Sequence, residues 1–234
     1  MNGTARGSSS VALKYVMAIS GLLLLGFVIA HLLGNLQLFL GRDALNTYAA
    51  NLQALGPLLW VARLGLLAIL IVHVATAVAL TRRNAAARPV AYAVSTPLKS
   101  TYASRTMVMS GLIVLAFVAY HLAHFTFGAI QPGAYDRHEW VVEGIEPVRR
   151  HDVYGMVVAG FSNPAVALSY VVAMVLLGLH LSHGVASFFQ SMGWIAPRYR
   201  GPIEKGAYAL TAAIVLGNCA MPLAVLAGLV GGGS

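Results

Sequence analysis

The sequence predicts an all-α integral membrane protein with five transmembrane helices. Of its 234 residues, 59% are hydrophobic and only 9% are charged, whereas a soluble domain typically carries about 25% charged residues. Five apolar runs are long enough for a helix of about 20 residues, the length that crosses a hydrocarbon core of about 30 Å. We therefore expect a single transmembrane domain over residues 1–234 and no soluble domain.

The five predicted spans follow one another along the chain, over residues 14–40, 58–81, 106–130, 164–189 and 206–229. The first run is longer than the apolar core of a cleaved signal peptide, about 7–15 residues, and no Ala-x-Ala site follows it, so we expect it to be retained. Pro57 and Pro164 stand where the second and fourth helices begin, a position that proline favours. No internal repeat is strong enough to build on.

The distribution of charge predicts the orientation of the spans. Ten of the 15 basic residues lie in the N-terminal segment and in the connections after the second and fourth spans: Arg6, Lys14, Arg82, Arg83, Arg88, Lys99, Arg105, Arg198, Arg200 and Lys205. Six of the seven acids lie on the opposite side: Asp43, Asp136, Glu139, Glu143, Glu146 and Asp152. Because basic residues stay in the cytoplasm, we expect a multi-pass protein of the cell inner membrane, with its N-terminus in the cytoplasm and its C-terminus outside. The net charge of +8 is then a topology signal and does not indicate nucleic acid.

Histidine occurs in each of the first four predicted spans, at His31, His73, His121 with His124, and His180 with His183. A titratable ring within a bilayer is costly and needs a partner. His31 and His121 lie 17 and 16 residues from the cytoplasmic ends of their helices, and His73 and His180 each lie 16 residues from the outer ends. At a rise of 1.5 Å per residue, each lies roughly 24 Å from its reference end. His31 and His121 therefore share a level in the outer half, and His73 and His180 share one in the inner half.

Two histidine pairs at two depths on four helices suit two bis-histidine haems stacked within a helical bundle. Two axial imidazoles close the iron to other ligands, which favours electron transfer. A zinc site would need about four ligands with carboxylates behind them, and no acid lies within the predicted spans. A proton relay usually includes Asp or Glu as well. The single cysteine, Cys219, excludes an internal disulfide and a thioether-linked haem.

Three further side chains lie near these levels. His124 and His183 are one helical turn from His121 and His180, on nearly the same face. Each either contacts a haem propionate or a quinone, or is a packed polar side chain bonded to a neighbouring helix. Arg63 either pairs with an outer propionate or extends outward to water.

These motifs together resemble the di-haem cytochrome b subunit of succinate:quinone oxidoreductases, which include the fumarate reductases, in the class with a single five-helix anchor. The matching stretches are "VIAHLLGN", "LIVHVATAV", "VAYHLAHF" and "SNPAV…LGLHLSHGVASFFQSMG". The resemblance covers nearly the whole chain. It implies a haem b bound by His31 and His121, and a second haem b bound by His73 and His180.

The resemblance also implies a function. The subunit would anchor a flavoprotein and an iron–sulphur subunit at the cytoplasmic face and carry electrons through the two haems to menaquinone or another quinone. From their positions near the outer end of their spans, and not from the resemblance, we expect Asn35, Gln37 and His124 to form a quinone site toward the outer haem. The alternative is ordinary solvation of a helix end. The other functional readings are a di-haem anchor of a nitrate reductase or hydrogenase, and a haem-free transporter that moves protons through histidines.

Overall fold

The computed structural model describes residues 10–87, 106–143 and 146–231. These residues are mostly helical and include five helical segments long and apolar enough to cross a membrane, as predicted: Ser10–Leu40, Pro57–Ala86, Met107–Thr126, Pro164–Ser191 and Pro197–Leu226. The regular helices within them are α1 (Ser10–Asn35), α3 (Pro57–Ala86), α5 (Met107–His121), α8 (Pro164–Ser191) and α9 (Arg200–Leu226). Arg6, Arg88, Lys99 and Arg105, which contribute to the predicted orientation, lie outside the described residues.

Shorter elements fill the connections. They are the 3₁₀ turns η1 (Leu36–Leu40) and η3 (Pro197–Tyr199), the helices α2 (Arg42–Ala54), α6 (Pro132–Tyr135) and α7 (Val153–Phe161), the π-helical turn η2 (Leu122–Thr126), and the strands β1 (His138–Glu143) and β2 (Glu146–His151). The antiparallel strands place His138 opposite His151 and Trp140 opposite Arg149. The sequence predicts only the five long apolar runs, and α2, α7 and the hairpin are found in the structure alone.

The helix ends follow local sequence signals. Pro57 and Pro164 are the first residues of α3 and α8, as expected. The side chain of Asn163 accepts a hydrogen bond from the N–H of Ala165 at 3.0 Å, which caps α8. The last span starts as α9 at Arg200, earlier than the predicted residue 206. Pro202 is compatible with this start because it lies in the first turn, where the backbone N–H has no partner within the helix.

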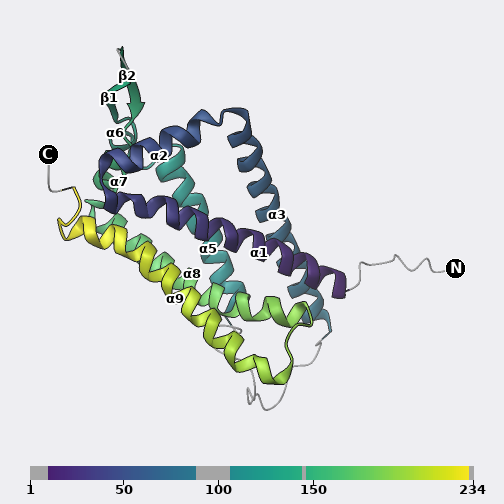
Figure 1. Ribbon diagram of the computed structural model, residues 1–234. Helices are drawn as coiled ribbons and strands as arrows, with labels where there is room; N and C mark the ends of the chain where they lie inside the picture. Colours follow the sequence, from purple (N-terminus) through teal and green to yellow (C-terminus); the bar gives the residue numbers. More distant parts are fainter. Residues whose placement is uncertain (1–9, 88–105, 144–145, 232–234) are drawn as a thin grey trace.

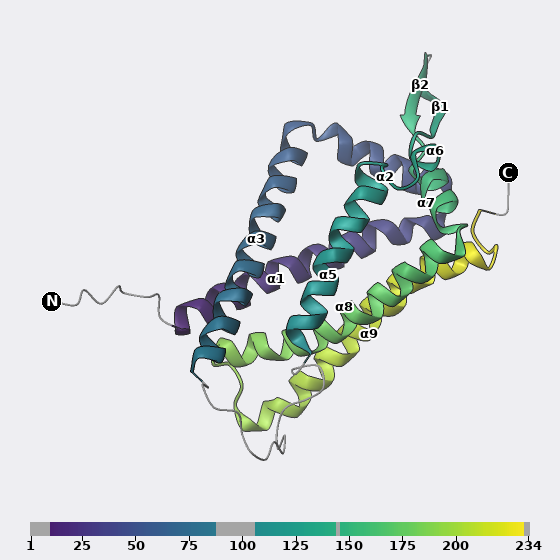
Figure 2. The same ribbon diagram turned by 180° about the vertical axis from the view of Figure 1, so that it is seen from behind.

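The long helices are arranged around α1 and α8. α1 contacts α3 and α8, α5 packs against α8, and α9 lies along α8. Figures 1 and 2 show α2, α6, α7 and the hairpin gathered at one end of the molecule, together with the end of α9. The start of α1, the end of α3 and the start of α9 lie at the opposite end. The helices therefore separate the connecting segments into the two groups that the charge pattern had assigned to opposite sides.

A buried polar cluster joins the hairpin end to α2. Asn46 is fully buried and donates to Glu139 Oε1 at 2.7 Å and to Asp152 Oδ1 at 2.9 Å, and it accepts from the N–H of Tyr154. Asp152 also pairs with Arg42 and caps α7 by accepting from the N–H of Gly155 at 2.9 Å. These bonds satisfy buried polar groups that would otherwise be costly, and they fix α2 and the hairpin to the start of α7.

Candidate functional site

The structure brings the four histidines together in the two predicted pairs. The rings of His31 on α1 and His121 at the end of α5 have centres 5.8 Å apart and planes 85° apart. The rings of His73 on α3 and His180 on α8 have centres 6.4 Å apart and planes 71° apart. All four side chains are only partly buried, so the protein leaves access to the space beside each pair.

The spacing within each pair fits a metal held between two imidazoles. With metal–nitrogen bonds of about 2.0–2.1 Å and ring centres about 1.1 Å beyond each bonded nitrogen, two opposed imidazoles on one metal have centres roughly 6 Å apart. Both observed separations lie close to this value. Each pair offers two imidazoles as protein ligands. A haem, which supplies the other ligands itself, fits that donor set.

The helices α3 and α5 expose most of their surface. Thr76 is the one buried residue along the 30 residues of this helix. Ser110 is likewise the one buried residue of α5. These two helices each carry one histidine of a pair, and their remaining surface is left for lipid, a cofactor or another chain.

Two serines that the sequence reading missed contact the inner pair. Ser20 Oγ lies 3.1 Å from His73 Nδ1, and Ser110 Oγ lies 3.3 Å from His180 Nδ1. Each hydroxyl also bonds to its own helix: Ser20 to the carbonyl of Val16 at 2.7 Å, and Ser110 to that of Met107 at 3.1 Å. Both Nδ1 atoms are therefore engaged, which leaves each Nε2 as the nitrogen for a ligand.

A sequence signal for these serines does exist. Residues 20–31, "SGLLLLGFVIAH", and residues 110–121, "SGLIVLAFVAYH", are identical at seven of twelve positions. This internal repeat corrects the expectation that none is strong enough to use. It places Ser20 and Ser110 at equivalent positions, each followed by glycine, and the repeat ends at His31 and His121.

His124 has the packed arrangement that was the alternative to a cofactor contact. Its side chain is 2% exposed, and both ring nitrogens are engaged. Nδ1 lies 2.9 Å from the hydroxyl of Tyr170, and Nε2 lies 3.1 Å from Gln131 Oε1. The π-helical turn η2 shifts His124 away from the simple helical face shared with His121, as π-turns do. Tyr170 links the two histidines, since its hydroxyl lies 3.4 Å from His121 Nδ1.

His183 and Arg63 are both engaged within their own helices. His183 Nε2 lies 2.9 Å from Ser187 Oγ, one turn further along α8, whereas it is His180 that faces His73. The guanidinium of Arg63 lies over the ring of Trp60, 5.2 Å from its centre, and the side chain is exposed. Neither position excludes a further contact with a bound group.

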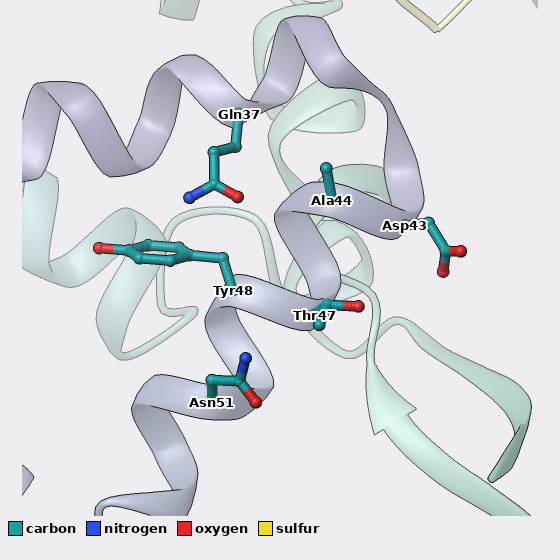
Figure 3. Close-up of a pocket in the computed structure, with 6 residues that line it drawn as sticks. All are labelled: Gln37, Asp43, Ala44, Thr47, Tyr48 and Asn51. Atoms are coloured by element: carbon teal, nitrogen blue, oxygen red, sulfur yellow. The ribbon is translucent and has the colours of Figure 1, made fainter.

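The amides proposed for a quinone lie at a different place from His124. Gln37 lines a pocket of about 450 Å³ together with Asp43, Ala44, Thr47, Tyr48 and Asn51. Figure 3 shows the side chains of Gln37, Tyr48 and Asn51 on one side of this pocket and the Asp43 carboxylate pointing away from them. Asn35 is half-buried just before this pocket, while His124 is bonded to Tyr170 and Gln131. The structure therefore groups Gln37 with the residues of α2 and leaves His124 in a separate cluster.

Comparison of the chain with protein-family models, curated proteins and solved structures gave no match. The function proposed below is therefore argued from the residues and their geometry.

Proposed function

We propose that this chain is the di-haem cytochrome b anchor of a succinate:quinone oxidoreductase. His31 and His121 would hold an outer haem b, and His73 and His180 an inner one. The observation that carries the proposal is the presence of two imidazole pairs on four candidate spans. The ring centres are 5.8 Å apart in one pair and 6.4 Å apart in the other. When bound, the haem irons supply one-electron transfer.

The residues of this chain hold and shield the two sites. Each pair comes from two different helices, so binding a cofactor also ties those helices together: α1 to α5 at one level and α3 to α8 at the other. Phe27 stacks on His31 with ring centres 5.3 Å apart, and Phe117 lies 6.0 Å from His121. These aromatic contacts help to hold the outer imidazoles in place.

We propose that the two soluble subunits, a flavoprotein and an iron–sulphur protein, dock at the end where α3 finishes and α9 begins. Lys14, Arg82, Arg83, Arg198 and Arg200 belong to this end, which the charge rule assigns to the cytoplasm. Phe189, Trp194, Tyr199, Pro202 and Ile203 line a shallow pocket of about 400 Å³ there. In this proposal the reaction of succinate belongs to the two soluble subunits.

The deciding experiment is to purify the protein with its partner subunits from membranes and count its haem. We expect two haems b per chain and a reduced-minus-oxidised spectrum of low-spin b type. A protein with the full fold and no haem would overturn the proposal and favour a haem-free transporter. A di-haem complex that oxidises hydrogen or reduces nitrate, and does not act on succinate, would assign the chain to another quinone-linked complex.

A further inference from the structure

We propose that Ser20 and Ser110 are positioning residues for the inner histidine pair: each accepts the Nδ1–H of one ring and so fixes Nε2 as the metal-binding nitrogen. The inference rests on the proposed binding of haem and goes further, because it assigns a role to two residues outside the ligand set. It also predicts that the two haem sites respond differently to the same kind of substitution.

The hydroxyl protons of both serines are directed to backbone carbonyls. Ser20 donates to the Val16 carbonyl at 2.7 Å, with the Met17 carbonyl also within 3.1 Å, and Ser110 donates to the Met107 carbonyl at 3.1 Å. Both serines are buried, at 5% and 2% exposure, so no water competes for these bonds. The shorter distances to the carbonyls favour donation of each hydroxyl proton to the helix, and we infer that each serine oxygen then accepts from the imidazole. The ring must then carry its proton on Nδ1 and present a lone pair on Nε2.

The glycine after each serine allows the helices to approach closely enough for this bond. A Cβ at Gly21 would lie 3.2 Å from His73 Cε1, and one at Gly111 would lie 3.4 Å from His180 Cε1. The contact at Gly21 is tight for a methyl group against a ring, and the contact at Gly111 is at the short end of ordinary van der Waals contact. Each Ser-Gly pair therefore contacts one imidazole. The serine bonds the ring nitrogen, and the glycine leaves space for the adjacent ring carbon.

This Ser-Gly arrangement occurs twice because residues 20–31 and 110–121 repeat one sequence. Ser20 and Ser110 are equivalent within the two copies of the 12-residue segment, and their targets are the two histidines of one pair. The copies also end alike, since Phe27 lies against His31 and Phe117 against His121. Helix α1 thus carries one histidine of the outer pair and contacts His73 of α3. Helix α5 carries the other outer histidine and contacts His180 of α8.

The outer pair is held in another way. His121 Nδ1 lies 3.4 Å from the hydroxyl of Tyr170, and His31 stacks on Phe27 at an angle of 18° between the ring planes. Loss of a serine hydroxyl at the inner level leaves these contacts intact. The outer haem is therefore an internal reference within the same molecule.

The serine bonds should change the electronic properties of the inner site. An acceptor on Nδ1–H makes the imidazole a stronger donor through Nε2, which favours the oxidised iron and lowers the reduction potential. Removal of one acceptor should raise the inner potential. We expect the ratio of reduced to oxidised inner haem at a fixed ambient potential to rise about threefold per serine, or about 28 mV at 59 mV per tenfold change.

The test is a redox titration of the purified complex in wild type, Ser20→Ala, Ser110→Ala and the double variant. We expect two haems in each, an upward shift of the inner potential that roughly adds in the double variant, and an unchanged outer potential. Ser182→Ala is the matched control: Ser182 lies on α8 beside His180 and His183, but its hydroxyl bonds to the carbonyl of Leu179 in its own helix. It should shift neither potential.

A second pair of variants guards against poor folding of the alanine proteins. Ser20→Thr keeps the hydroxyl, and Ser20→Val matches the shape of threonine without it. We expect the threonine variant to retain the wild-type inner potential and paramagnetic resonance spectrum, and the valine variant to change both.

The proposal is overturned if the threonine and valine variants give the same inner potential, or if the serine variants move both haems equally. It is also overturned if Ser182→Ala produces the same shift. Each of these results leaves the di-haem assignment standing, because two haems are still counted. A wild-type protein without haem would instead remove the proposed function and this inference together.

Discussion

The imidazole of His73 on α3 faces that of His180 on α8, with ring centres 6.4 Å apart. Depth counting along the two helices predicts this partnership, since both residues lie 16 positions from a proline at the helix start. His183, one turn away, is bonded to Ser187. The structure therefore places His180, and not His183, beside His73.

Haem loss should follow pairs of histidines. We expect His31→Ala and His121→Ala each to remove the outer haem and keep the inner one, and His73→Ala and His180→Ala each to do the reverse. Loss of one axial ligand opens the iron and weakens the retention of a cofactor that is not covalently attached. Haem stoichiometry and redox titration of each purified variant measure this. Loss of different haems from two members of one pair would contradict the assignment.

The neighbouring histidines should be dispensable for haem binding. We expect His183→Ala and His124→Ala to retain two haems, because both side chains are bonded to other protein groups. Shifts in potential are expected for His124→Ala, since Tyr170 connects it to His121. The decisive comparison is with His180→Ala: one haem in His183→Ala and two in His180→Ala would reverse the ligand assignment.

The orientation of the chain can be read by cysteine labelling in intact cells. Trp140 in the hairpin is 71% exposed, and Tyr199 at the opposite end is 49% exposed. We expect Trp140→Cys to react with a membrane-impermeant reagent added outside, and Tyr199→Cys to react only after the cells are opened. The native thiol gives little background, because Cys219 is buried. The reverse pattern would invert the predicted topology.

The quinone prediction now separates into two places. If the pocket beside α2 binds the quinone head group, Gln37→Ala should raise the KM for quinone by about 2- to 10-fold, the effect of losing one hydrogen bond. Asn35→Ala and His124→Ala test the other two residues. Unchanged quinone reduction and inhibitor sensitivity in all three variants would exclude an outer site of this composition and favour one near the inner haem.

Acid should loosen the hairpin end of the protein. Burial alone would raise the pKa of Asp152, but hydrogen bonds from Asn46 and the Gly155 N–H, with the charge of Arg42, hold that pKa below its usual value. The ionised carboxylate therefore contributes stability above the unfolded pKa of about 3.9, and this contribution is lost as pH falls through the folded value. We expect the thermal midpoint to fall more steeply between pH 5 and 3 (roughly this window) in wild type than in Asp152→Asn. Asp136→Asn, at an exposed acid, is the control and should keep the wild-type slope.

Much of the architecture follows from the sequence alone. The five spans are determined by their apolar length, because backbone groups in a bilayer must be bonded within a helix. The levels of the four histidines follow from the constant helical rise. The repeat that begins with Ser-Gly and ends with His is also present in the sequence. Similarity between two apolar segments carries little information until the structure shows what their residues contact.

Tertiary packing decided the rest. The π-turn after His121 changes the direction of His124, and periodicity along an ideal helix gives no sign of it. Asn46 and Asp152 meet through a fold that joins distant parts of the chain, so their burial depends on how α2, the hairpin and α7 pack. The serines bond to histidines on other helices for the same reason: sequence fixes the position of a side chain along its own helix, whereas the approach and rotation of two helices are set by the side chains that pack between them.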